Sequence, residues 1–181
     1  MRRFQQALCL AALLIGAGAV SGCGYTLAGR GSFLPAYIRV IGIPTFANHT
    51  SVFNVEQIFT QKVRAEFIGR GRYEVKPTNT DVDAVLTGEV NSISIVPVSF
   101  TGQQQASRYT ITVVAKISLF DTHQNKELWS NPAMQFQEDY EATSGTSALD
   151  PAAFFGQQGQ ALERISDDFA RTVVTAILEA F

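Results

Sequence analysis

With 181 residues, 46% of them hydrophobic and 17% charged, the chain has the composition of one globular domain, which excludes a disordered or fibrous protein. Its formal net charge is -2 and no basic stripe is present, so we expect no nucleic-acid partner. Two cysteines, Cys9 and Cys23, are too few for a disulfide-rich fold.

Residues 1–22 have the three-part order of an export signal. Arg2 and Arg3 give a positive start, an apolar stretch rich in Ala and Leu follows, and small residues precede Cys23. The apolar stretch is shorter than the roughly 20 residues that a membrane span needs. The sequence Val-Ser-Gly-Cys at residues 20–23 resembles the lipobox of bacterial lipoproteins. This resemblance implies cleavage between Gly22 and Cys23 and attachment of diacylglycerol and palmitate to the Cys23 thiol.

The alternative for this segment is an ordinary secretory signal that happens to end near a cysteine, but it leaves the tetrapeptide unexplained. Several acyl chains on Cys23 would hold the protein on a membrane effectively permanently. Residue 24 is Gly rather than Asp, which by resemblance to proteobacterial lipoprotein sorting favours the outer membrane. Residues 23–35 are Gly-rich and unpatterned, so we predict a short tether before a single domain at 36–181.

The first half of that domain predicts a strand, a turn and a helix. Residues 36–43 are rich in Ile, Val and Tyr and lie between two prolines, which predicts a strand. Residues 45–51 contain a turn-like cluster. Apolar residues at helical spacing predict an amphipathic helix over 54–69, with Asn54 as its N-cap and Gly69 or Gly71 at its end.

The second half predicts mainly strands. A short strand begins at Tyr73, and residues 84–100 and 108–120 form two long strands of an antiparallel hairpin. A fourth strand over 127–140 contains Pro132, which implies a sheet edge or a bulge. Residues 157–180 carry an apolar stripe typical of a helix that faces a core, and Asp150-Pro151 marks its start.

This order predicts an α+β fold. Two amphipathic helices would pack on one face of a mostly antiparallel sheet of about four strands, as a two-layer sandwich. One segment does not fit a sheet with one solvent-exposed face, because residues 93–100 are apolar on both sides of the strand. Either another part of the chain buries this segment or it docks a partner.

The sequence offers little catalytic chemistry. His49 and His123 lie in predicted turns without a second ligand at metal-binding spacing, so we expect no metal site. The carboxylate pairs Asp81/Asp83 and Asp167/Asp168 are best interpreted as solvated surface. No nucleophile elbow, phosphate loop or zinc motif is present. We therefore expect a protein that is not an enzyme and needs no cofactor.

The order of several short motifs resembles the LptE family of lipopolysaccharide-assembly lipoproteins, also called rare lipoprotein B. The resemblance covers nearly the whole chain after the leader. Its residues are Cys23-Gly24-Tyr25, Leu34-Pro35, Ile38, Val40, Gly42-Ile43-Pro44, Phe46, Asn48, Thr50, Thr60, the stretch FIGRGRY at 67–73, Ala84, Leu86, Gly88, Tyr109 and Leu128-Trp129.

The resemblance implies an outer-membrane lipoprotein on the periplasmic side or within the lumen of the LptD β-barrel. Such a protein plugs the barrel, assists its assembly and helps deliver lipopolysaccharide to the outer leaflet, without catalysing a reaction. Basic side chains would meet lipid A phosphates through charge-assisted hydrogen bonds. On the predicted hairpin, Arg108 and Lys116 are the candidate ligand-binding residues.

Two other functions stay open on sequence grounds. Residues 41–50 also look like the strand-and-turn opening of the peptidoglycan-synthase activator LpoB and the curli secretion lipoprotein CsgG. An activator that crosses the periplasm needs a long linker, whereas only residues 24–35 separate Cys23 from the first predicted strand. A periplasmic hydrolase would need a clustered nucleophile and base, which the sequence does not offer.

Overall fold

The computed structural model describes residues 34–70, 72–102, 106–141, 150–157 and 159–180. The predicted signal peptide 1–22, the cleavage site at Gly22 and Cys23, and the tether up to residue 33 lie outside these residues.

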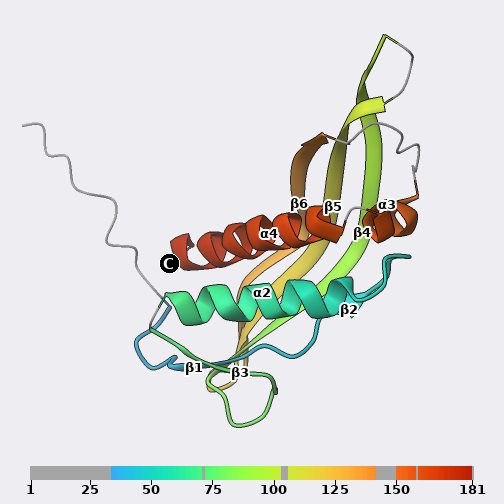
Figure 1. The fold of residues 1–181 in the computed structure, drawn as a ribbon. Helices are drawn as coiled ribbons and strands as arrows, with labels where there is room; N and C mark the ends of the chain where they lie inside the picture. Colours follow the sequence, from blue (N-terminus) through green and yellow to red (C-terminus); the bar gives the residue numbers. More distant parts are fainter. Residues whose placement is uncertain (1–33, 71, 103–105, 142–149, 158, 181) are drawn as a thin grey trace, which may run out of the picture. The chain divides into compact units, whose positions relative to one another are not determined.

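Three long strands form an antiparallel meander. They are β4 (Ala84–Phe100), β5 (Ala106–Asp121) and β6 (Lys126–Glu141), and they run side by side in Figure 1. Side chains alternate between a buried and an exposed face along β4 and β5, as the period of a strand requires. The predicted hairpin and the predicted following strand are both confirmed.

Three short strands enlarge the sheet to six, somewhat more than the approximately four that the sequence predicts. They are β1 (Val40–Gly42), β2 (Ala47–Asn48) and β3 (Glu74–Lys76). The main order is β3-β1-β4-β5-β6, with β2 also paired to β4, and all pairings of the short strands are parallel. The strand predicted over 36–43 shortens to β1 because Ala36 and Tyr37 form a turn.

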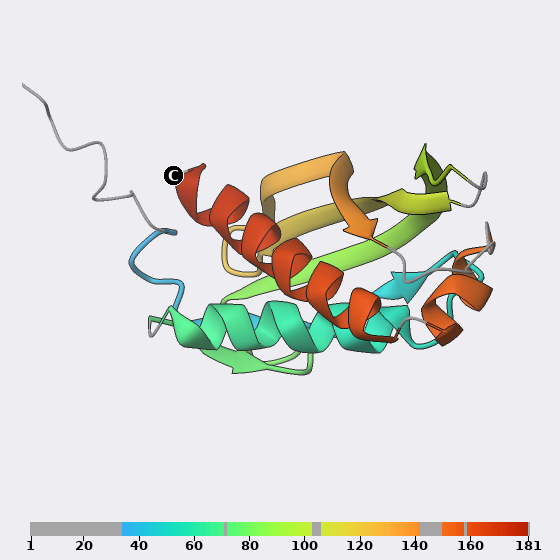
Figure 2. The same cartoon turned by 45° about the horizontal axis from the view of Figure 1, so that its top comes forward.

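Both predicted helices are present and lie on one face of the sheet (Figure 2). α2 (Val55–Gly69) and α4 (Gly159–Glu179) pack against each other, and the rings of Phe59 and Phe169 stack with centroids 4.5 Å apart. The short helix α3 (Pro151–Gln157) precedes α4. The α+β class with two helices on one face is therefore confirmed.

Asn54 precedes α2 as predicted, but its side chain makes no capping hydrogen bond. Its backbone instead takes a left-handed conformation with φ 62°, which asparagine tolerates better than most residues. Its carbonyl accepts a hydrogen bond from the N–H of Ile58 at 3.1 Å. The predicted end of the helix at Gly69 is confirmed.

The core lies between the helices and the sheet, and α3 extends it toward the tip of the β4–β5 hairpin. Phe154 of α3 is fully buried and its ring meets the edges of Tyr109 and Tyr140. Farther down the sheet the ring of Phe46 lies on Gly88. A Cβ at this glycine would come within 2.8 Å of three ring atoms, so only glycine fits there.

β6 lies at one edge of the sheet and carries a bulge at Pro132, so both features that Pro132 predicts are present. The register with β5 shifts between the pairs Ala115↔Met134 and Ile117↔Asn131. Inside the bulge, the N–H of Ala133 donates to Oδ1 of Asn131 at 3.1 Å. The bulge is therefore stabilised by a hydrogen bond between two of its own residues.

Candidate functional site

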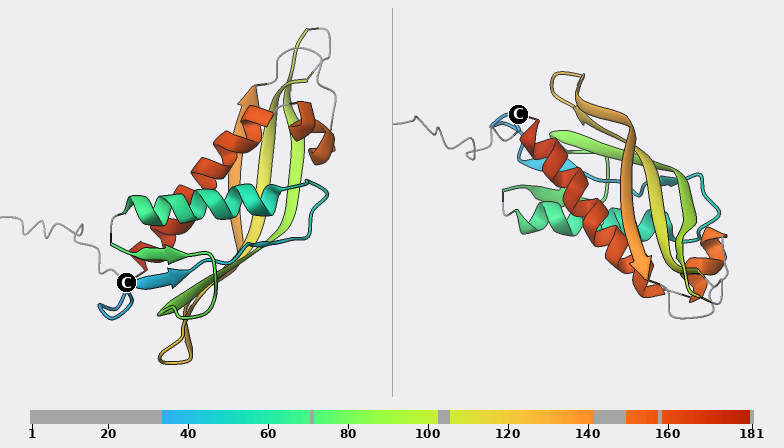
Figure 3. Two further views of the ribbon diagram at one scale, coloured as in Figure 1. Left: turned by 60° about the horizontal axis from the view of Figure 1, so that its bottom comes forward. Right: turned by 90° about the horizontal axis from the view of Figure 1, so that it is seen from above.

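The face of the sheet opposite the helices is covered by none of the described residues (Figure 3). Its central rows carry uncharged side chains at strand positions that the register places side by side: Ser92, Ser94, Thr112, Val114, Gln135 and Gln137. Gln137 donates to Thr112 across β5 and β6 at 3.3 Å. We call this surface the open face, and its centre lacks the charges that usually cover a solvated sheet.

The two predicted ligand-binding residues lie on the open face but far apart. Arg108 and Lys116 are eight residues apart on β5, which places them about 26 Å from each other along the strand. Each forms an ion pair: Arg108 with Glu141 at 3.0 Å and Lys116 with Glu89 at 3.1 Å. The structure therefore does not bring the two cations together into one site.

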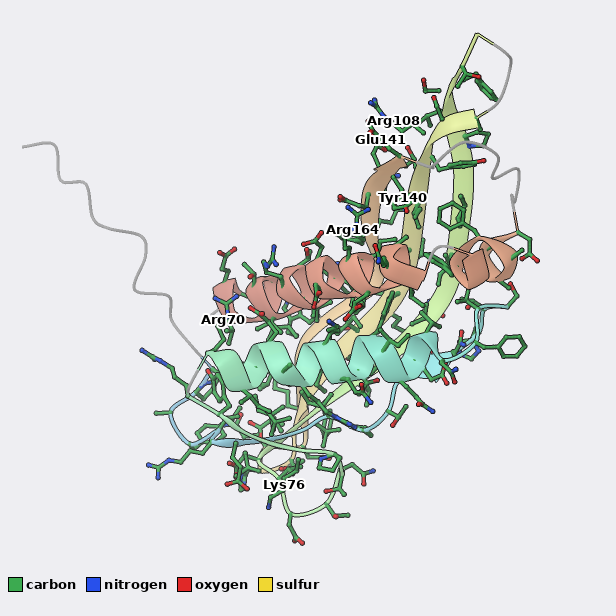
Figure 4. All side chains as sticks on the ribbon, viewed as in Figure 1. Arg70, Lys76, Arg108, Tyr140, Glu141 and Arg164 are labelled. Carbon is green, nitrogen blue, oxygen red and sulfur yellow. The ribbon has the colours of Figure 1, made fainter. Side chains whose placement is uncertain are left out.

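Arg108 instead lies beside a groove of about 560 Å³ between the end of β6 and the start of α4. Figure 4 shows Arg108, Tyr140, Glu141 and Arg164 gathered there. The Arg164 guanidinium lies 5.1 Å from the centre of the Tyr140 ring, within the range of a cation–π contact. Asp139, which accepts from Thr110 at 2.6 Å, also lines the groove. Two cations thus face two carboxylates.

Sequence reasoning missed Arg164 and Tyr140 as members of this groove. Arg164 is one of several polar residues that alternate with the apolar stripe of α4, so the sequence does not single it out. Only the tertiary packing places it over Tyr140. The groove can form several hydrogen bonds to a polar partner. Its balanced charges do not favour an isolated anion.

The apolar segment at residues 93–100 divides between the two faces of β4. Ile93 and Ile95 are buried beneath the helical layer, so another part of the chain does cover that side. On the other side Val96, Val98 and Phe100 keep 54%, 51% and 60% of their surface exposed. Three exposed apolar residues near the hairpin tip form a surface suited to contact with a partner.

A polar cluster ties the chain before β1 to the end of the sheet. The carboxylate of Asp83 accepts hydrogen bonds from the backbone N–H groups of Arg39 at 2.9 Å and Val40 at 2.8 Å, and it lies 2.7 Å from Nε2 of His123. Asp121 accepts from the Tyr37 hydroxyl and from the backbone N–H groups of His123 and Gln124. We call these residues the polar clip.

The hydrogen bonds of the polar clip change the acidity of its members. The bond with His123, followed by the two backbone donors, lowers the pKa of Asp83 to about 2. Burial raises the pKa of Asp121, but the donors around it outweigh burial and lower the pKa overall. The bond to Asp121 raises the pKa of Tyr37. The interpretation of Asp83 as solvated surface is therefore wrong, because its carboxylate is partly buried and hydrogen-bonded.

The polar clip holds chain segments rather than reacting groups. Its donors are largely backbone amides, and it joins the segment before β1, the start of β4 and the turn after β5. Within the described ranges no three His, Cys, Asp or Glu side chains group as a metal site would require. In the same ranges, no helix is long and apolar enough to cross a membrane.

Residues 41–50, which carry much of the family resemblance, have structural roles. Arg64 of α2 donates Nε and Nη2 to the carbonyl of Ile43 at 2.8 and 2.6 Å. A Cβ at Gly42 would meet the Thr78 carbonyl oxygen at 2.3 Å. Asn48 accepts from the Thr50 N–H and hydroxyl and donates to the Val52 carbonyl, which confirms the predicted turn.

Solved structures to which this chain is similar include several bacterial proteins at low sequence identity. CT253 from Chlamydia trachomatis matches with a TM-score of 0.52 at 10% identity, over 77% of this chain and 95% of that one. A PelC dodecamer from Paraburkholderia phytofirmans gives 0.50 at 16% identity, over 82% and 93%. The lipoprotein B from Nitrosomonas europaea gives 0.49 at 15% identity, over 87% and 96%.

No curated protein sequence matches the chain. A family model does: its description is LptE, lipopolysaccharide-assembly, and it covers residues 38–177, most of the domain described above. The motif residues from Ile38 to Trp129 lie within this range, whereas Cys23-Gly24-Tyr25 and Leu34-Pro35 precede it. The chain therefore belongs to the LptE family of lipopolysaccharide-assembly proteins.

Proposed function

We propose that this chain is an outer-membrane lipoprotein that partners the LptD β-barrel as plug and assembly factor and helps deliver lipopolysaccharide to the outer leaflet. The observation that carries the proposal is the family match over residues 38–177. In this proposal the protein acts by shape and contact, without catalysing a reaction. Residues 1–22 direct export, and lipid on Cys23 anchors the domain.

The open face supports a role inside a barrel. Fully buried centres of protein interfaces are depleted of charge, as the centre of the open face is. The lumen of an outer-membrane barrel is polar, which suits the Ser, Thr and Gln side chains at this centre. Val96, Val98 and Phe100 add an apolar contact at one end of the same surface. We propose that this face lies against the barrel wall.

Arg108 and Lys116 are proposed to meet lipid A phosphates at two separate points. Their side chains are 49% and 48% exposed, so each can leave its carboxylate partner for a phosphate without losing buried contacts. Surface ion pairs contribute at most about 1 kcal/mol, which makes this exchange inexpensive.

Copurification tests the partnership. Tagged protein solubilised from outer membranes should retain a large β-barrel protein, and depletion of the chain should lower surface lipopolysaccharide. A photo-crosslinking residue at Thr112 on the open face should capture that barrel, whereas one at Asp168 on α4 should not. Recovery of a peptidoglycan synthase in place of a barrel would overturn the proposal and favour a regulator such as LpoB.

The anchor is tested separately. Cys23→Ala should leave the precursor uncleaved by the lipoprotein peptidase and unlabelled by radioactive palmitate. Ser21→Ala serves as the matched control, because it keeps a small residue before the cysteine and should be processed normally. Normal acylation of the Cys23→Ala variant would refute the assignment of this residue.

A further inference from the structure

A second groove, of about 540 Å³, lies where the described chain begins. The segment before β1, the residues after α2 and the start of β3 contribute to it. Figure 3 shows the start of the described chain and the end of α2 at the same end of the domain. The lining residues are Leu34, Ala36, Ile38, Arg39, Arg72, Tyr73 and Glu74.

The groove combines an apolar floor with a basic rim. Leu34 and Ile38 are buried at 4% and 3% exposure, and Tyr73 is half-buried. Burial raises the pKa of Tyr73, against the opposing effect of a hydrogen bond from the Leu34 backbone, which also fixes the ring beside this residue. Arg39 and Arg72 are exposed, and Glu74 is the one acid among the lining residues.

Arg70 lies at the same end of the domain but has a structural role. It pairs with Glu66 at 2.8 Å and reaches Thr175 of α4 at 3.2 Å, so it fastens the ends of the two helices together (Figure 4). Arg39 and Arg72 are both exposed and line the second groove. This groove has more cations than carboxylates, in contrast to the balanced groove at Arg108.

The distance to the proposed anchor limits what can occupy the groove. Leu34 follows Cys23 by 11 residues, and a fully extended segment of this length spans at most about 40 Å. If Cys23 carries lipid, as the proposed function requires, the groove is held within this distance of the leaflet that contains the acyl chains. Anionic phospholipid headgroups attract basic side chains that are held near a bilayer surface.

We propose that this groove binds the phosphate headgroup of an anionic phospholipid in the leaflet that holds the anchor. The guanidinium groups of Arg39 and Arg72 donate charge-assisted hydrogen bonds to the phosphate oxygens. The domain would thereby take a fixed orientation on the membrane, with the polar clip beside the bilayer surface. This inference rests on the anchor of the proposed function.

Vesicle flotation tests the inference with the chain after the leader, carrying Cys23→Ser so that no lipid contributes. Every core residue of the described ranges lies between Leu34 and Leu178, so removal of residues 1–22 leaves the core intact. The protein should float with vesicles of phosphatidylglycerol and phosphatidylcholine in equal parts. It should not float with phosphatidylcholine alone, and salt should weaken its binding.

The double variant Arg39→Gln/Arg72→Gln should lower the partition coefficient about 25-fold, because each basic residue near an anionic surface is worth about 1 kcal/mol. The matched control Lys62→Gln/Arg171→Gln removes two cations from the helical layer and should bind as the unaltered chain does. Circular dichroism should show that all three proteins are equally folded.

Equal binding of the double variant and the unaltered chain would overturn the inference, as would absence of binding to phosphatidylglycerol. Binding only to vesicles that contain lipopolysaccharide would also overturn it, since the ligand would then be the transported lipid. These outcomes are independent of copurification with a barrel. A chain that retains its barrel but ignores phosphatidylglycerol refutes this inference alone.

Discussion

The two faces of the β4–β5–β6 sheet differ in what covers them. One face is closed by α2, α3 and α4, and its side chains are large and apolar, with Ile111, Ile117 and Leu119 of β5 fully buried. The open face presents Ser, Thr, Val and Gln at matching positions of the same strands. The first face accounts for the stability of the fold, and the second is available for a partner.

This difference explains why the domain can be stable and still serve as half of an interface. Among the described residues no buried side-chain nitrogen or oxygen lacks a hydrogen-bond partner, so the core needs no partner protein to satisfy its polar groups. A partner can therefore cover the open face without rearrangement of the core. The same substitution made on each face tests this difference in stability most directly.

The largest effect is expected for Phe59→Ala in the helical layer. Phe59 is fully buried and stacks on Phe169, so its truncation should lower the free energy of unfolding by about 3–5 kcal/mol. Phe100→Ala removes the same side chain at the uncovered tip and should change it by less than about 0.5 kcal/mol. Urea unfolding measures both, and similar losses for the two variants would contradict the division into a stabilising and an available face.

A smaller effect, present only in one pH range, is expected for the polar clip. The folded-state pKa of Asp83 is lowered from 3.8 to about 2. Its contribution is therefore present above the unfolded pKa and is lost as the pH falls through the folded value. Asp83→Asn should cost about 1–2 kcal/mol near neutral pH and should remove part of the decline in stability between about pH 4 and pH 2.

The matched control for the polar clip is Asp81→Asn. This residue lies two positions earlier at a left-handed backbone position that asparagine also adopts, with φ 54°. Its acid-unfolding curve should follow that of the unaltered chain. Circular dichroism measures the loss of folded protein as the pH falls. If both variants alter this loss, or if neither does, the hydrogen bonds of Asp83 do not stabilise the fold.

The smallest effect on stability is expected on the open face itself. Lys116→Gln breaks the exposed pair with Glu89 and should change the free energy of unfolding by less than about 0.5 kcal/mol. The same substitution should reduce lipopolysaccharide that copurifies with the protein, whereas Arg171→Gln on α4 should not. A large loss of stability, or unchanged lipopolysaccharide, would place Lys116 among purely structural residues.

The long elements of this fold could be predicted because their patterns are local. Alternation along residues 108–120 indicates which side chains of β5 are buried, and the stripe through Phe169 predicts α4. Strands were predicted where β1 and β3 lie, from their Ile, Val and Tyr content, but β2 and the parallel pairing were not, since strands of two or three residues contain no readable period. Their pairing depends on contacts across the chain.

The candidate sites were less predictable, because they too depend on contacts between distant parts of the chain. Arg108 and Lys116 could be proposed from their charge and their strand, but their partners Glu141 and Glu89 follow from register alone. His123 and Asp83 are 40 residues apart and meet only because β4 and β5 are antiparallel. Prediction from one sequence therefore located the strands that carry the surfaces, and the pairings required the structure.

The bulge at Pro132 has a consequence for the long edge strand β6. Proline has no N–H to offer, and the next amide, that of Ala133, is already bound to Asn131 within its own turn. An incoming strand from a second molecule would not find a regular ladder of donors at this bulge. Self-association through this part of the β6 edge is thereby discouraged.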